Sequence, residues 1–282
     1  MVSIRTELLN LIEQINAAIN LPTVRRVYIP DPRPTAQGHP QFGVVELDDG
    51  AAGLFYAWLG ESQKGMHERF NTDDLVGIQA IELARKYADT NDMDRSVGLA
   101  TINAITQSVF IRSNVGSCST SDSMGGISLV PGDRLGMVGN FPSLVRQARK
   151  GGVPVTVVER KHHMLNRTQG IQVTLDSKVL RDCNKIICTA ATLINDSVDE
   201  VLEYCLHADM VVMIGPSASF FPDPMFSRGV AVVGGTRVLD PVGLIDGLKM
   251  GQGLADHVYR YTLSDNEYVG TLQLCATLSK SK

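Results

Sequence analysis

A turn that contains glycine, followed by a carboxylate at a set distance along the chain, is the feature of this sequence best suited to ligand chemistry. The segment 133–159 reads DRLGMVGNFPSLVRQARKGGVPVTVVE, in which two apolar runs flank a predicted helix. The first run leads into the turn 139–142, and the second delivers Glu159 at its end, 159 − 139 = 20 positions after Gly139. Glycine lets a ligand approach the backbone, the start of the helix supplies free N–H groups, and an acid at the end of the second strand can accept hydrogen bonds from ribose hydroxyls. The spacing is therefore compatible with an adenosine-type ligand such as S-adenosylmethionine.

The turn matches neither of the common phosphate-binding sequences. It lacks the G-x-G-x-x-G of dinucleotide sites and the Lys-Ser/Thr of the phosphate loop. The alternative interpretation is that Gly139 only makes a tight turn between strand and helix and that Glu159 is solvated. The residues leave both interpretations open.

Three later apolar runs, 185–191, 210–214 and 230–233, also end in small or hydroxylated residues. The residues concerned are Thr189, Thr192 and Asn195 in the first case, Gly215, Pro216 and Ser217 in the second, and Gly235 and Thr236 in the third. Parallel strands share a direction, so their carboxyl ends meet at the edge where open α/β sheets place a ligand crevice. We therefore expect one shared site, although each segment alone is ordinary turn chemistry. No Ser/His/acid spacing identifies a catalytic set.

Asn103 is a polar residue inside the apolar helical segment 96–105, SVGLATINAI. Its side chain is either exposed on the helix or directed to the interface with the second half of the chain.

Histidine and cysteine residues lack the spacing of known metal sites. The candidate ligands are His162 and His163, Cys205 with His207, Cys183 with Cys188, and Cys118. None of them forms a C-x-x-C or H-x-x-x-H pair. We expect Cys188 and Cys205 to be small core residues and the two adjacent histidines to belong to a basic surface turn. Cys118, in a loop rich in Ser and Gly, is the better candidate for a reactive thiol.

Apolar periodicity divides the chain into two halves. The first half predicts a helix over 3–20, strands over 25–29, 41–47 and 52–58 with a tight turn at Asp49-Gly50, and helices over 73–89 and 94–111. After the Ser/Gly-rich stretch 113–132, the pattern predicts strands over 134–138, 153–158, 185–191, 210–214 and 230–233, and helices over 143–150, 198–207 and 241–250. Strands that are apolar throughout and alternate with helices are typical of a doubly wound parallel sheet. We predict an α/β protein with a small α+β domain (1–115) followed by a Rossmann-like α/β domain (116–282).

Composition excludes several classes of protein. Hydrophobic residues make up 44% and charged residues 20% of the 282 positions, which are globular values, and the net charge of 26 − 30 = −4 argues against nucleic-acid binding. No apolar run reaches the roughly 18–20 residues that span a bilayer. The 5 scattered cysteines fit a reducing cytoplasm, and Glu7 and Glu13 make the first segment an amphipathic helix rather than a signal peptide. We expect a cytoplasmic protein with no nucleic-acid or membrane partner and, from the frequency of two-fold assemblies, a homodimer.

Six segments in order carry a resemblance to a known family. They are SVGLATINAI (96–105), DRLGMVGNFPSLV (133–145), VVERK (157–161), LRDCNKIICTAATLIN (180–195), VVMIGPSASFFPDPMF (211–226) and VAVVGGTRVLDP (230–241). Together they resemble the "putative heavy-metal chelation" family over nearly the whole chain. The resemblance implies a Rossmann-like domain preceded by a small domain like the enolase N-terminal domain, with the binding or active site in the cleft between them. Segments 30–40 and 60–70 are unlike the usual first domain, so no family role is carried over to them.

The resemblance also implies a set of site residues. Carried over by position, they are Asn103, Gly139, Asn140, Phe141, Glu159, Thr189, Thr192, Asn195, Gly215, Pro216, Ser217, Gly235, Thr236 and Asp240.

Two functions follow from these observations. The resemblance implies a protein that binds a metal ion, such as a divalent cation, or a metal complex in the cleft between the domains. The turn at Gly139 and the acid Glu159 indicate the alternative, a transferase-like enzyme that acts with an adenosine- or phosphate-bearing molecule such as S-adenosylmethionine, for example in metallophore or cofactor assembly. A sensor or scaffold with the same pocket is a third interpretation. The sequence identifies no catalytic residue and leaves open whether there is turnover.

Overall fold

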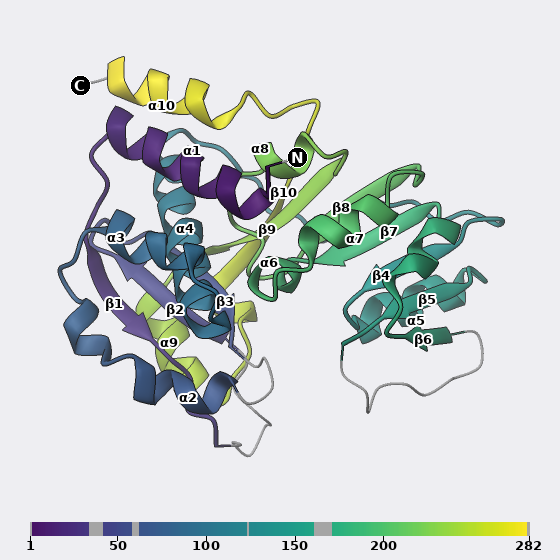
Figure 1. Cartoon of the computed structure of the whole chain (residues 1–282), viewed down its shortest axis with the longest axis horizontal. Helices are drawn as coiled ribbons and strands as arrows, with labels where there is room; N and C mark the ends of the chain where they lie inside the picture. Colours follow the sequence, from purple (N-terminus) through teal and green to yellow (C-terminus); the bar gives the residue numbers. More distant parts are fainter. Residues whose placement is uncertain (1, 34–41, 58–61, 123, 161–170, 281–282) are drawn as a thin grey trace.

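The computed structural model of the chain describes residues 2–33, 42–57, 62–122, 124–160 and 171–280. It contains a three-stranded sheet in the first half and a seven-stranded sheet in the second, with helices around both (Figure 1). The fold is the mixed α/β architecture that the alternating pattern predicts.

The small sheet is antiparallel and comes from neighbouring stretches of sequence. Its strands β1 (Val24–Tyr28), β2 (Phe42–Leu47) and β3 (Ala52–Tyr56) lie in the order β1-β2-β3. Between β2 and β3, Gly50 has φ 87°, a conformation that glycine adopts without strain. This confirms the turn predicted there.

Helix α4 (Asp92–Arg112) covers one face of the small sheet at very close range. A Cβ on Gly53 of β3 would lie 2.0 Å from the carbonyl oxygen of Ala100, so no side chain fits at that position. Every residue of α4 from Asp94 to Phe110 is buried. The helix therefore carries its polar residues, Asn103 among them, into the interior.

The other helical segments of the first half lie around α4 and the small sheet. They are α1 (Ile4–Ala18), α2 (Ser62–Arg69), α3 (Ala80–Ala84) and the 3-10 turns Thr72–Leu75 and Arg85–Ala88. The single helix predicted over 73–89 is wrong. Gly77 has φ 82° and its N–H donates to the carbonyl of Val24 at 2.8 Å, while the N–H of Val24 donates to the carbonyl of Ile78 at 2.9 Å. The backbone at Gly77 and Ile78 therefore pairs with the first residue of β1, and the chain cannot continue as a helix there.

The large sheet has the strand order of Rossmann-type folds. Its strands are β4 (Leu135–Val138), β5 (Val155–Val158), β6 (Ile171–Thr174), β7 (Lys185–Thr189), β8 (Met210–Ile214), β9 (Val232–Val238) and β10 (Val258–Ser264), in the order β10-β9-β8-β7-β4-β5-β6. Every neighbouring pair is parallel except β9 and β10. The chain runs outward from β4 to β6 and then returns to β7 on the other side of β4. The topological switch point therefore lies between β4 and β7.

Helices connect the strands of the large sheet. They are α5 (Pro142–Lys150), α6 (Ala191–Ile194), α7 (Val198–Tyr204), α8 (Asp223–Phe226) and α9 (Pro241–Lys249), with 3-10 turns at Ser177–Asp182 and Ala255–His257, and α10 (Thr271–Lys280) follows the last strand. The predicted helices over 143–150, 198–207 and 241–250 are confirmed with small differences in their ends.

Elements of the second half complete the core of the first. Strand β9 extends beyond the predicted run 230–233, and α9 packs on the face of the small sheet opposite α4. The small sheet, β9 and α9 form one buried apolar cluster at this contact. Its residues are Val44, Ala52, Leu54, Val238, Leu244, Ile245 and Leu248. Helix α10 lies along α1 (Figure 1), and the rings of Phe110 and Phe221 pack edge to face with centroids 5.7 Å apart. The two halves are joined by buried contacts, and the domain boundary at 115/116 stays a prediction.

No helix in the described part of the chain is long and apolar enough to span a bilayer.

Candidate functional site

The switch point brings together Gly139, Phe141 and Thr189. Gly139 follows β4 with φ 84°, in the region that favours glycine. A Cβ there would lie 2.9 Å from Cγ2 of Thr189 and 3.9 Å from the Phe141 ring. Helix α5 begins at Pro142, and no side chain among the described residues caps its N-terminus. The turn after β4 therefore packs against the last residue of β7, and the start of α5 follows directly.

Glu159 lies directly after β5, as predicted, and its negative charge acts on Tyr56 at the end of β3. The half-buried Glu159 receives a hydrogen bond on Oε1 from the N–H of Arg160 at 2.9 Å. Burial, and to a smaller extent the negative charge of Glu159, raise the pKa of Tyr56 to about 12. A carboxylate has this effect only on a nearby phenol. Tyr56 of the first half is therefore within electrostatic range of the carboxylate that follows β5.

Asn103 joins the two halves from α4. Its side chain is fully buried, and Nδ2 donates to the carbonyls of Leu54 at 2.9 Å and Ser217 at 3.0 Å. Two carbonyl acceptors fix the orientation of the amide, because only its NH2 group can donate to both. The interface interpretation of Asn103 is confirmed, and an exposed position is wrong. Oδ1 is buried without a hydrogen-bond partner among the described residues, so the amide keeps one acceptor beside the loop after β8.

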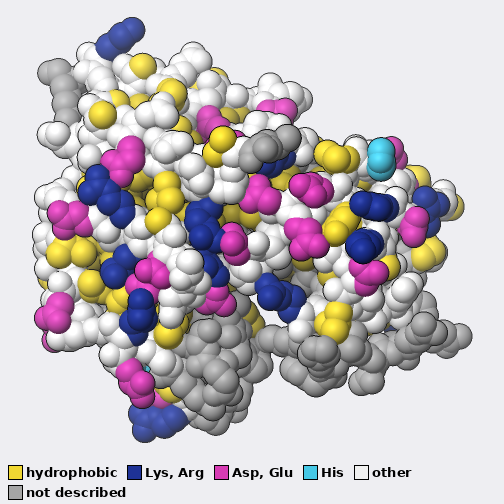
Figure 2. Space-filling view, viewed as in Figure 1, with side chains coloured by type: hydrophobic (Ala, Val, Ile, Leu, Met, Phe, Trp, Pro, Cys, Tyr) yellow, Lys and Arg dark blue, Asp and Glu magenta, His cyan; other side chains and the backbone are white. Residues whose placement is uncertain are grey.

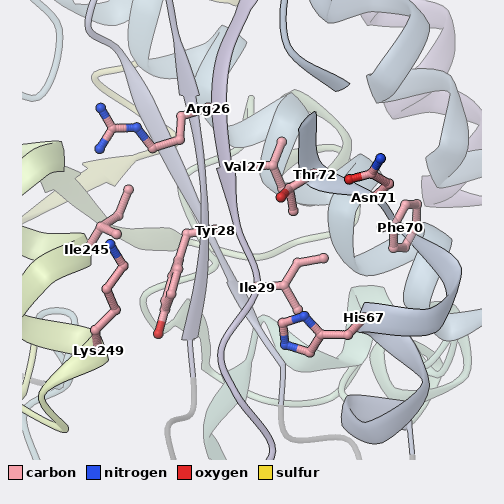
Figure 3. A pocket seen from close by; sticks show the side chains of 10 residues that line it. All are labelled: Arg26, Val27, Tyr28, Ile29, His67, Phe70, Asn71, Thr72, Ile245 and Lys249. Carbon is pink, nitrogen blue, oxygen red and sulfur yellow. The ribbon is translucent and has the colours of Figure 1, made fainter. Parts of the chain in front are cut away.

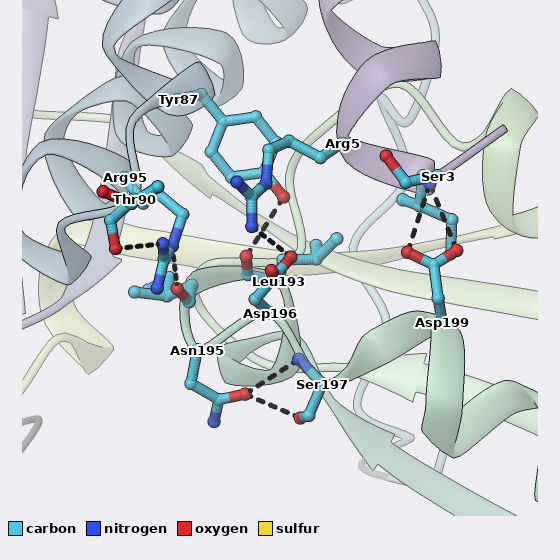
Figure 4. A network of polar contacts seen from close by, with 12 residues as sticks. Ser3, Arg5, Tyr87, Thr90, Arg95, Leu193, Asn195, Asp196, Ser197 and Asp199 are labelled. Atoms are coloured by element: carbon cyan, nitrogen blue, oxygen red, sulfur yellow. Dashed lines mark hydrogen bonds and ion pairs between the residues drawn. The ribbon is translucent and has the colours of Figure 1, made fainter.

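Side chains of the first half also hold the turn that follows β7 (Figure 4). The hydroxyl of Tyr87 donates to the carbonyl of Leu193 at 3.1 Å, and Nε of the buried Arg95 donates to the carbonyl of Ile194 at 2.6 Å. Next to them, Arg5 pairs with Asp196. These contacts fix one wall of the switch-point region to the N-terminal helices.

Two of the predicted site residues in this turn have structural hydrogen bonds. The hydroxyl of the buried Thr192 donates to the carbonyl of Thr189 at 2.8 Å. Oδ1 of Asn195 accepts from the N–H and the hydroxyl of Ser197 at 3.2 and 2.6 Å. The carbonyl of Asn195 in turn accepts from Nη1 of Arg160 at 3.2 Å, which ties the loops after β5 and β7 together.

Gly235 and Thr236 lie inside β9, not after it. The expectation that they end a strand is wrong, because antiparallel pairing with β10 continues past both positions. The hydroxyl of Ser219 donates to the carbonyl of Thr236 at 2.8 Å and accepts from its N–H at 3.0 Å. A Cβ on Gly235 would lie 2.6 Å from the hydroxyl oxygen of Tyr261. Thr236 therefore ties β9 to the loop after β8, and Gly235 leaves room for the Tyr261 side chain of β10.

Asp240 lies apart from the switch point. Its Oδ1 accepts from the N–H of Gly243 at 3.0 Å, which caps α9, and its Oδ2 is 3.6 Å from Nδ1 of His257. Asp240 is therefore the N-terminal cap of α9, the helix that packs on the small sheet. Of the predicted residues not yet placed, Asn140 is exposed, whereas Gly215 and Pro216 are half-buried.

The described residues offer little to a bare metal ion. They contain no group of three or more His, Cys, Asp or Glu side chains that could hold one. Burial raises the pKa of four cysteine thiols, which are those of Cys183, Cys188, Cys205 and Cys275. A protonated, buried thiol is a poor ligand. Cys118 is exposed, and the predicted surface turn with His162 and His163 lies outside the described residues.

These features define a class: an α/β protein with a Rossmann-ordered seven-stranded sheet and a separate small antiparallel sheet. Two family models match the chain, DUF364 over residues 124–263 and DUF4213 over residues 40–106, and both are described as "Putative heavy-metal chelation". The chain belongs to this family.

Solved structures share the fold. A DUF364 protein of unknown function from Desulfitobacterium hafniense has a TM-score of 0.71 at 19% identity, over 93% of this chain and 100% of that one. One from Pyrococcus horikoshii has a TM-score of 0.67 at 21% identity, over 91% and 99%. An uncharacterized protein of Methanocaldococcus jannaschii is 24% identical over 173 residues, which is 60% of this chain and 65% of that protein. The match therefore spans slightly less than two thirds of that relative.

Sequence reasoning did not single out Tyr56 or Arg160. Tyr56 lies inside the apolar run AGLFYAW and resembles a core aromatic, whereas Glu159, whose charge acts on it, is far away in sequence. Arg160 follows Glu159 directly, and that adjacency was the available signal for a basic group at the same edge of the sheet.

Proposed function

We propose that the protein binds an adenosine-type small molecule, with S-adenosylmethionine as the first candidate, at the carboxyl ends of β4, β5 and β7. The observation that carries this proposal is the Rossmann strand order with Gly139 in a positive-φ turn and Glu159 directly after the next strand. The uncapped start of α5 suits polar ligand atoms, Glu159 suits ribose hydroxyls, and the half-buried Phe141 ring suits the base.

Residues of the first half support one shared site. The phenol of Tyr56 lies near the Glu159 carboxylate, and Asn103 has a buried acceptor beside the loop after β8. Figure 2 shows a notch in the surface between the half with the small sheet and the half with β4 to β6. In this proposal the cleft between the halves and the Rossmann crevice are the same place.

The family description favours a second function, which is binding of a metal ion or metal complex in this cleft. The described residues hold no cluster that could hold an ion, so we favour a complex whose organic part supplies most of the metal ligands. A transferase-like step in the assembly of such a molecule would unite both functions. Free cysteines fit a reducing cytoplasm, where we expect the protein to act as a homodimer without nucleic-acid or membrane partners.

Calorimetric titration of the purified protein with S-adenosylmethionine, adenosine, Zn2+ and Ni2+ tests this proposal. We expect the adenosine compounds to bind and the bare ions to bind no more tightly than about 1 mM. Glu159→Gln removes the charged acceptor and should weaken nucleoside binding by about 1.5–3 kcal/mol. Glu203→Gln, at an exposed position of α7, is the matched control and should bind as the wild type does.

Two results would reverse the conclusion. If no adenosine compound binds, or if Glu159→Gln binds them unchanged, the nucleoside function is wrong. Tight binding of a bare ion that survives Glu159→Gln would transfer the assignment to metal binding.

A further inference from the structure

A cavity of about 550 Å³ lies beside β1, away from the predicted crevice residues (Figure 3). Its described lining residues come from β1 and the residue after it, from α2 and the segment that follows it, and from α9, and none of these residues belongs to the predicted site set. Its volume is within the range of pockets that hold small molecules, roughly 300–1,000 Å³. The site is therefore a separate candidate for a ligand.

Side chains from both faces of β1 line this cavity. It is the edge strand of the small sheet, and successive side chains of a strand point to opposite faces. Figure 3 shows Arg26 and Tyr28 on the side of Ile245 and Lys249 of α9, whereas Val27 lies on the opposite side of the strand. One side of the cavity therefore combines two cations and a phenol with an aliphatic surface.

The guanidinium group of Arg26 has hydrogen-bond donors that are free to bind a ligand. Its Nε lies 3.5 Å from Oε2 of the buried Glu46, and Nη1 of Arg25 lies 3.6 Å from the other carboxylate oxygen. One carboxylate thus faces two guanidinium groups. Within the described ranges, no hydrogen bond or ion pair engages Nη1 or Nη2 of Arg26, and these atoms form the planar fork that matches phosphate and carboxylate oxygens.

Lys249 adds a second positive charge on the same side. Its Nζ lies 3.2 Å from Oδ1 of Asp246 one turn earlier, with both side chains 58% exposed. An exposed pair of this kind is weak and competes poorly with a ligand. The described lining residues include no Asp or Glu, although the carboxylates of Glu46 and Asp246 each lie beside one of the two cations.

We propose that this cavity binds an organic anion, with its phosphate or carboxylate group held by Arg26 and Lys249 and its apolar part against Tyr28 and Ile245. The phenol of Tyr28 supplies one further donor to the anion. This site is independent of the nucleoside or metal site proposed for the crevice.

Titration of the full chain with phenyl phosphate, benzoate and inorganic phosphate tests the assignment. We expect phenyl phosphate or benzoate to bind with a dissociation constant below about 1 mM, and the comparison of the two identifies the acidic group. Inorganic phosphate should bind at least about tenfold more weakly, because it lacks the part that contacts Ile245. Lys249→Gln and Arg26→Gln should each weaken binding about tenfold.

Matched controls separate this site from general charge effects and from the crevice. Lys150→Gln removes an exposed lysine of α5 and should leave binding unchanged, as should Glu159→Gln. Lys249→Gln carries the test if Arg26→Gln unfolds the protein, because Lys249 is largely exposed. Absence of binding to the wild type at about 10 mM of either aromatic anion, or equal binding by wild type and Lys249→Gln, would overturn the proposal.

Discussion

Replacing Asn103 with Ala removes an amide that hydrogen-bonds to both halves of the molecule, and its effect on stability can be worked out from its contacts. Nδ2 donates to two carbonyl groups, and the side chain has no exposed surface. Each lost hydrogen bond costs about 0.5–1.5 kcal/mol, and more when the carbonyl left behind is buried. The substitution also removes the buried Oδ1, which has no hydrogen-bond partner among the described residues. This offsets part of the lost stability. We expect a loss of about 2–3 kcal/mol in the free energy of unfolding.

Chemical and thermal denaturation followed by circular dichroism measure this loss. At about 2–4 °C per kcal/mol for a chain of this size, the midpoint should fall by roughly 4–12 °C. Ile111→Ala, on the same helix but 49% exposed, is the control and should change stability by less than about 0.5 kcal/mol. If Asn103→Ala is no more destabilising than Ile111→Ala, the amide does not hold the halves together and the account of the interface is wrong.

Two further predictions concern ionisable groups. Glu159→Gln should lower the pKa of Tyr56 from about 12, because it removes a negative charge near the phenol; NMR titration of labelled tyrosine measures this, and an unchanged pKa would contradict their proximity. Hydrogen bonds from Arg228 at 2.8 and 2.9 Å hold the pKa of Glu7 below its usual 4.5, so the pair stabilises the fold above that pH and its contribution is lost as the pH falls through the lowered value. Glu7→Gln should therefore cost about 1 kcal/mol at neutral pH, as expected for a partly exposed pair, and almost nothing at an acidic pH below the lowered pKa of Glu7. Denaturation at both pH values gives the two losses, and equal losses would refute this reading.

The central strands of the large sheet were predictable because they are buried on both faces. Runs such as VPVTVV and MVVMI contain almost no polar residues. The strands β6 and β10 lie at the two edges and are only partly buried. An edge strand needs no continuous apolar run, so its sequence resembles that of a loop.

Parts of the candidate site were predictable for local reasons. Gly139 and Glu159 follow strands whose ends the apolar pattern defines. The positions of Gly235 and Thr236 were mistaken because pairing with β10, which the pattern did not reveal, lengthens β9. Tyr56 depends on a partner in a distant segment, and no local pattern records such a contact.

The packing of α9 on the small sheet has a consequence for protein synthesis. Strands β1 to β3 leave the ribosome early, yet one apolar face, with Val44 and Leu54, stays bare until the chain has been made through Lys249. Nascent chains that expose such a surface are prone to aggregate. Fragments that end before Pro241 should therefore be less soluble than the full chain, which expression of both would test.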